Sequence, residues 1–162
     1  VRSQPGQGTT FHTYLPMIRR AIGSVVSTAS EILPFGDEHI LFIDDEPQLA
    51  KMQKQNLSLL GYKVTMMTGS LDALAAFRAA PDSFDMVITD MTMPKLTGDK
   101  LAQAIKKIRP DIPVVLCTGF SEKINNDEIS DLKIDDFLTK PVHKERLAKT
   151  IRNILDEKKT GT

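Results

Sequence analysis

Four short segments of this sequence carry side chains that together suit chemistry on a phosphoryl group. They are Asp44-Asp45-Glu46-Pro47, Asp90-Met91-Thr92-Met93-Pro94, Thr118-Gly119 and Thr139-Lys140-Pro141. Three carboxylates brought close together would repel one another unless a cation joined them. Mg²⁺ suits that position, because it binds oxygen ligands and usually keeps waters and a phosphate oxygen in its octahedral shell. The residue types therefore predict a magnesium-assisted site.

With a metal present, one carboxylate can attack phosphorus while the metal and an ammonium group stabilise charge on the phosphoryl oxygens. Lys140 supplies the ammonium group, and the Thr118 hydroxyl can donate a hydrogen bond to the bound phosphoryl group. Gly119 beside it leaves room for the ligand. The expected product is an aspartyl phosphate.

The elements that would position these residues follow from the pattern of apolar side chains. Short apolar runs predict strands at 40–43, 63–66, 86–89, 114–117 and 137–138. Helical periodicity between and after them predicts helices over 47–60 and around 71–77, 101–108, 122–132 and 147–155. In the first helix, the residues expected to face inward are Leu49, Met52, Leu59 and Leu60. Alternating strands and helices predict an α/β, doubly wound parallel sheet covered on both faces.

Each polar strand end also has an ordinary structural explanation. An acidic pair before a proline is typical of a helix N-terminus, and an Asp at a strand end often forms a turn. The combination favours a site, because in such sheets ligands bind at the carboxyl ends of the strands. Asp44, Asp90, Thr118 and Lys140 all fall at those ends.

The composition of the chain bears on its binding partners and on the cellular compartment in which it works. The 162 residues include 21 Lys+Arg and 21 Asp+Glu, and this zero net charge speaks against nucleic acid as a partner. The longest apolar run, from Ile112 to Cys117, is too short to span a membrane, so no membrane contact by this chain is expected. The single cysteine, Cys117, is expected to be buried, and its lack of a partner favours a cytoplasmic protein.

Residues 39–157, about three quarters of the chain, resemble the receiver domain of two-component response regulators. The segments that carry the resemblance are Ile43-Asp44-Asp45-Glu46-Pro47, Asp90-Met91-Thr92-Met93-Pro94-Lys95-Leu96-Thr97-Gly98, Thr118-Gly119 and Phe137-Leu138-Thr139-Lys140-Pro141. The resemblance implies a flavodoxin-like sheet of five strands in the order 2-1-3-4-5 with five helices. It also implies phosphoryl transfer from the phosphohistidine of a histidine kinase, with a histidine phosphotransfer protein as a second candidate partner.

The same resemblance assigns roles to individual residues. Asp90 would be the phosphoacceptor, and Asp44 and Asp45 would bind Mg²⁺ together with Asp90 and the backbone carbonyl of Thr92. Thr118 and Lys140 would bind the phosphoryl group. The rotamer of Phe137 would switch together with Thr118, and the peptide bond between Lys140 and Pro141 would be cis.

Two positions depart from the family pattern. Lys133 stands where the family usually has a glycine before the last strand, so the turn there is expected to differ. Phe120 stands where many members carry a polar residue that can reach the hydrolytic water. Because an apolar ring should hinder water, we expect a long-lived aspartyl phosphate.

The N-terminal residues predict a strand over 10–15 after a glycine-rich turn. Gly6-Gln7-Gly8-Thr9-Thr10-Phe11 followed by Tyr14-Leu15-Pro16 resembles the last glycine-rich box and final strand of the histidine kinase ATP-binding domain. An ordinary turn before a strand is the alternative. The resemblance implies the C-terminal part of a hybrid sensor kinase, whose parent chain can be attached to a membrane. The expected divisions are kinase remnant 1–16, linker 17–37, receiver 38–158 and tail 159–162.

Two other functions are alternatives to the receiver. A magnesium-dependent phosphohydrolase also forms an aspartyl phosphate, but its nucleophile follows the first strand in an Asp-x-Asp pattern, whereas this chain has Asp44-Asp45-Glu46 there. A pseudo-receiver that only binds proteins would not need the acidic set and Lys140.

Overall fold

The computed structural model describes residues 1–14, 33–119 and 134–160, and the chain divides into two compact units. The units are Val1–Glu31 and Ile32–Thr162, and each is described by itself.

The first unit holds a small antiparallel hairpin of β1 (Arg2–Gln4) and β2 (Gly8–Thr10). The turn between them is closed by Gln7 N–H, which donates to Gln4 O at 3.0 Å, and Gly6 has a positive φ of 76° that favours glycine. The prediction of a strand over 10–15 is wrong for the described residues, since β2 ends at Thr10. Among the described residues, 11–14 pair with no strand, whereas the turn brings 8–10 against β1.

The second unit is built on a parallel sheet of five strands. They are β3 (His39–Ile43), β4 (Lys63–Met67), β5 (Met86–Asp90), β6 (Val114–Thr118) and β7 (Asp136–Thr139). Their order in space is β4-β3-β5-β6-β7, and every neighbouring pair is parallel. Numbered within this sheet, the order is 2-1-3-4-5, so the expected doubly wound topology is confirmed.

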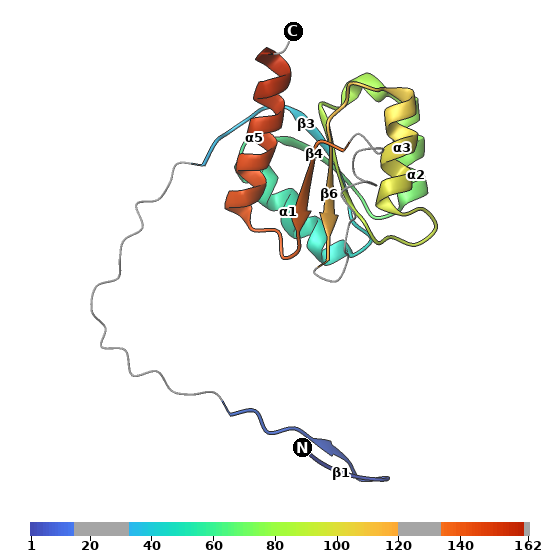
Figure 1. Cartoon of the computed structure of the whole chain (residues 1–162), viewed down its shortest axis with the longest axis vertical. Helices are drawn as coiled ribbons and strands as arrows, with labels where there is room; N and C mark the ends of the chain where they lie inside the picture. Colours follow the sequence, from blue (N-terminus) through green and yellow to red (C-terminus); the bar gives the residue numbers. More distant parts are fainter. Residues whose placement is uncertain (15–32, 120–133, 161–162) are drawn as a thin grey trace, which may run out of the picture. The chain divides into compact units, whose positions relative to one another are not determined.

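Helices cover both faces of the sheet. They are α1 (Pro47–Leu59), α2 (Ser70–Ala79), α3 (Gly98–Ile108) and α5 (Lys144–Thr160), with a short 3₁₀ turn, η1, at Pro81–Ser83. Figure 1 shows α1 and α5 on one side of the strands and α2 and α3 on the other. The helix expected around 122–132 lies outside the described residues. No helix within the described ranges is long and apolar enough to cross a membrane.

Successive side chains of β3 point to opposite faces of the sheet and pack into two separate hydrophobic cores. Ile40 and Phe42 of β3 pack with buried residues of α1 and α5, and Leu41 and Ile43 pack with buried residues of α2 and α3. This alternation is what a strand covered on both faces requires.

The inward face of α1 agrees only in part with the predicted one. Leu60, just after the helix, is buried and Leu49 is half-buried, as predicted. Met52 and Leu59 are exposed, and the buried residues within the helix are Ala50, Gln53 and Leu57. Several apolar stripes are possible on this helix, and its packing against the sheet and α5 selects one that includes a polar residue.

The segment before β3, residues 33–38, is packed onto the domain, and we call it the lead-in segment. Leu33 contacts the core under α1 and α5, and Gly36 N–H donates to Leu60 O at 3.0 Å. Glu38 accepts hydrogen bonds from Arg152 Nη2 and Lys159 Nζ of α5, each at 2.8 Å. The chain is therefore fixed to α5 before the first strand of the sheet begins.

Candidate functional site

Asp44 is held directly after β3 by its own backbone and side chain. Its N–H donates to Met67 O at 3.2 Å, which extends the pairing with β4 by one residue. Its Oδ1 accepts the Glu46 N–H at 3.0 Å, a turn that leads the chain into α1 at Pro47. Asp44 is only 3% exposed, whereas the next residue, Asp45, is exposed.

Asp90 is the last residue of β5, the central strand, and is 6% exposed. The ladder continues beyond it, because Met91 N–H donates to Cys117 O at 2.8 Å. The loop then returns to the same place, where Gly98 N–H donates to Met91 O at 2.8 Å. A Cβ at Gly98 would collide with the carbonyl oxygen of Asp90, so the start of α3 closes against the strand end only because a glycine is there.

Lys140 approaches both aspartates from the edge strand β7. Its backbone N–H donates to Thr118 O at 2.7 Å, which fixes the residue one position beyond β7. Its Nζ lies 2.7 Å from Asp90 Oδ1 and 2.9 Å from Asp44 Oδ2. The peptide bond between Lys140 and Pro141 is cis, as the resemblance implied.

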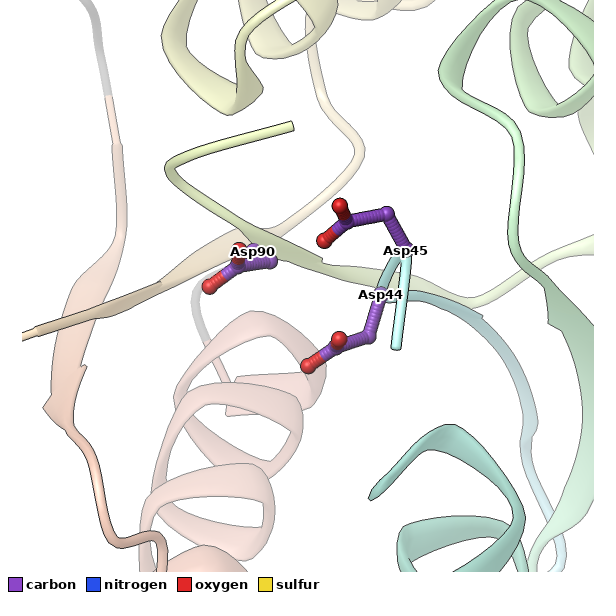
Figure 2. A group of neighbouring side chains, drawn as sticks. All are labelled: Asp44, Asp45 and Asp90. Atoms are coloured by element: carbon purple, nitrogen blue, oxygen red, sulfur yellow. The ribbon is translucent and has the colours of Figure 1, made fainter. Parts of the chain in front are cut away.

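The three carboxylates form one cluster at the carboxyl edge of the sheet. Their ligand atoms lie within 4.8 Å of one another, and Figure 2 shows the Asp45 carboxylate pointing toward Asp90. Burial raises the pKa of Asp90 above its ordinary value, and the charges of Asp44 and Asp45 add to this, while the hydrogen bond from Lys140 opposes it. Burial lowers the pKa of Lys140, but its hydrogen bonds to Asp90 and Asp44 outweigh this and leave the pKa raised. Lys140 is therefore a permanent cation in the cluster.

The cluster fits a hard divalent cation. All of its side-chain donors are oxygens, and the exposed Asp45 leaves the site open to the water ligands that Mg²⁺ usually keeps. Among the described residues, Lys140 is the one ammonium group paired with the two buried carboxylates, which leaves negative charge for a metal to neutralise.

The other predicted site residues lie near this edge but take part less directly. Thr118 is buried at the end of β6, beside the backbone of Lys140, and Phe137 is half-buried on β7 opposite Leu116. Thr92 is exposed, two residues after Asp90. Their roles as phosphoryl ligand, switch pair and carbonyl ligand stay predictions. Phe120 and Lys133 lie outside the described residues.

Sequence reasoning missed one residue next to this site. Gln53 of α1 is 6% exposed and donates from Nε2 to Val142 O, just beyond Lys140, at 3.1 Å. Its signal in the sequence is a polar residue within an otherwise apolar helix face, but the apolar residues of α1 do not by themselves identify that face.

The chain belongs to the response regulator receiver domain family, since the family model of that description matches residues 40–152. A solved receiver domain from Clostridium thermocellum has a TM-score of 0.73 and 34% identity, and covers 77% of this chain and 99% of that one. The chemotaxis protein CheY4 of Vibrio cholerae has a TM-score of 0.67 and 26% identity, covering 74% of this chain and 99% of that one.

Two kinds of curated relative match different lengths of the chain. The probable transcriptional regulator ycf27 of Cyanidium caldarium is 34% identical over 72% of this chain and 46% of its own length. The sensor kinase CckA of Brucella abortus is 27% identical over 96% of this chain and 17% of its own length. The chain thus spans less than half of either relative.

Proposed function

We propose that this chain accepts a phosphoryl group from a phosphohistidine onto Asp90, with Mg²⁺ bound by Asp44, Asp45, Asp90 and the backbone carbonyl of Thr92. The observation that carries the proposal is the position of Lys140 Nζ, 2.7 Å from Asp90 and 2.9 Å from Asp44, within a cluster of three carboxylates. A half-buried ammonium group beside a buried carboxylate at the end of the central strand can stabilise the charge that develops on a phosphoryl group during transfer.

In the transfer, a carboxylate oxygen of Asp90 forms the new bond to phosphorus. The bond between phosphorus and the donor imidazole nitrogen breaks, and that nitrogen keeps the electron pair. Lys140 stabilises the phosphoryl oxygens as their charge develops, and Thr118 donates its hydroxyl hydrogen to one of them. Bound Mg²⁺ would supply further charge neutralisation at the same edge.

We further propose that the parent protein is a hybrid sensor kinase. The support is the extent of the match to the sensor kinase of Brucella abortus, which covers 96% of the chain, whereas the match to the Cyanidium caldarium regulator covers 72%. The donor would be the phosphohistidine domain of the same or another kinase, and a histidine phosphotransfer protein is a candidate recipient. An ATP-binding domain encoded immediately upstream of Val1 would support this context, and an unrelated upstream sequence would contradict it.

The acceptor is tested by incubating the protein with a small phosphodonor such as acetyl phosphate, with and without Mg²⁺, and measuring its intact mass. We expect one added phosphoryl group in the presence of Mg²⁺, none after Asp90→Asn, and unchanged labelling after Asp82→Asn. Asp82 is a matched control because it is exposed on η1. Labelling of the Asp90→Asn variant at the wild-type stoichiometry would overturn the assignment.

A further inference from the structure

Gln53 is a buried polar residue on a helix face that otherwise packs against the core. It is 6% exposed, and the other buried residues of α1 are Ala50 and Leu57. A buried amide is costly unless its groups are hydrogen-bonded, so its partners reveal what holds it there.

The oxygen and the nitrogen of the Gln53 side-chain amide each form a hydrogen bond, and these two bonds fix the orientation of the amide. Asn56 Nδ2, one turn further along α1, donates to Gln53 Oε1 at 3.3 Å. The Nε2 group therefore faces the opposite way and donates to Val142 O at 3.1 Å. This bond joins α1 to the loop between β7 and α5, two residues after Lys140.

The loop that carries the reactive lysine joins β7 to α5. Lys140 N–H is bonded to Thr118 O on one side, and α5 begins at Lys144 on the other. A pocket of about 410 Å³ borders the loop, and its lining includes Gln53, Lys140 and Val142. Val142 is partly buried and packs against the core under α1 and α5, and the hydrogen bond from Gln53 adds a directional contact to this apolar packing.

We propose that Gln53 is a positioning residue that holds the 140–142 loop against α1 and so keeps Lys140 Nζ between Asp44 and Asp90. The expected effect of Gln53 on phosphoryl transfer rests on the function proposed above. Its effect on the position of Lys140 is independent of that function. Displacements of about 1 Å in a positioned group can slow a reaction a hundredfold. Loss of one hydrogen bond that acts through the loop should slow phosphorylation of Asp90 about three- to tenfold.

The test compares Gln53→Met and Gln53→Glu with the control Gln55→Met. Methionine keeps the size of the side chain and removes both hydrogen-bonding groups, while glutamate keeps an acceptor for Asn56 but replaces the donor that faces Val142 O. Gln55 is exposed on the same helix, so Gln55→Met makes the same chemical change away from the loop. Denaturation curves establish that each variant is folded.

Two readouts separate positioning from a merely structural role. The first is the ¹⁵N-detected signal of the Lys140 ammonium group in the metal-free protein, assigned by its loss in Lys140→Met. The second is the rate of labelling by acetyl phosphate with Mg²⁺. We expect both Gln53 variants to broaden or shift the ammonium signal and to be labelled three- to tenfold more slowly, with Gln55→Met like the wild type.

Wild-type ammonium signals and labelling rates in both folded Gln53 variants would overturn the proposal. A changed signal with an unchanged rate would overturn the part that concerns phosphorylation. If the wild type itself takes up no phosphoryl group, the proposed function fails, and the ammonium signal alone then decides whether Gln53 positions Lys140.

Discussion

The ionic cluster at Glu38 makes a quantitative prediction about stability and pH. Glu38 is 9% exposed, and its carboxylate accepts hydrogen bonds from Arg152 and Lys159 at 2.8 Å. The hydrogen bond from Arg152 is the main reason that the pKa of Glu38 falls from 4.5 to about 2, while burial opposes the fall. We therefore expect Glu38→Gln to destabilise the domain at neutral pH.

The size of the effect follows from this lowered pKa. A fall from 4.5 to about 2 corresponds to about 3.4 kcal/mol at about 1.36 kcal/mol per pKa unit. Lys159 is 63% exposed, so solvent screens its share, and we expect a loss of about 2 to 3 kcal/mol. Because the folded pKa is depressed, the contribution is complete above pH 4.5 and is lost as pH falls toward 2.

The assay is urea denaturation of the wild type and Glu38→Gln at several pH values between 7 and 3. The difference in free energy of unfolding between them should shrink by about 1.5 to 2 kcal/mol between pH 6 and pH 3. Asp156→Asn is the control, since Asp156 bonds the same Arg152 at 2.9 Å but is 58% exposed and should contribute about 0.5 kcal/mol or less.

A difference between wild type and Glu38→Gln that stays constant from pH 7 to pH 3 would refute this reasoning. It would mean that the carboxylate titrates alike in the folded and unfolded chain. The ionic contacts of the lead-in segment would then contribute nothing to its attachment.

Two further predictions concern the start of α3 and the thiol of β6. Gly98→Ala should lower the free energy of unfolding by about 1 to 3 kcal/mol, because the new methyl group meets the Asp90 carbonyl oxygen, whereas Gly119→Ala should be nearly neutral since a Cβ there meets nothing within 4 Å. Equal losses measured by denaturation for the two variants would contradict this. Burial raises the pKa of the Cys117 thiol to about 12, so Ellman's reagent at pH 8 should label the native protein at least a hundredfold more slowly than the unfolded one. Complete labelling of the native protein within minutes would contradict the burial of this thiol.

The strands and the acidic edge could be predicted because their signals are local. Each strand is a short apolar run. Residues that follow parallel strands must lie at one edge of the sheet, so the sequence alone predicts that Asp44, Asp90 and Lys140 are neighbours. The structure places Lys140 Nζ within 2.9 Å of both aspartates, a distance that no spacing in the sequence gives.

The buried face of α1 and the polar contacts of Gln53 and Glu38 depend on contacts between distant parts of the chain, so the sequence did not predict them. The inward face of α1 is set by its packing against the sheet and α5, which buries Gln53 and exposes Met52. The bond from Gln53 to Val142 spans 89 positions, and that from Arg152 to Glu38 spans 114. Neither leaves a periodic signal, because each is a single polar pair.

The lead-in segment is attached at the edge of the sheet opposite the acidic cluster. Glu38 and the C-terminal half of α5 lie at the amino ends of the strands, whereas Asp44 lies at the carboxyl end of β3. The five residues of β3 at about 3.3 Å each put these two edges about 16 Å apart. Residues 33–38 therefore leave the acidic edge to the side chains that follow β3, β5 and β7, which is the edge that a phosphoryl donor would have to reach under the proposed function.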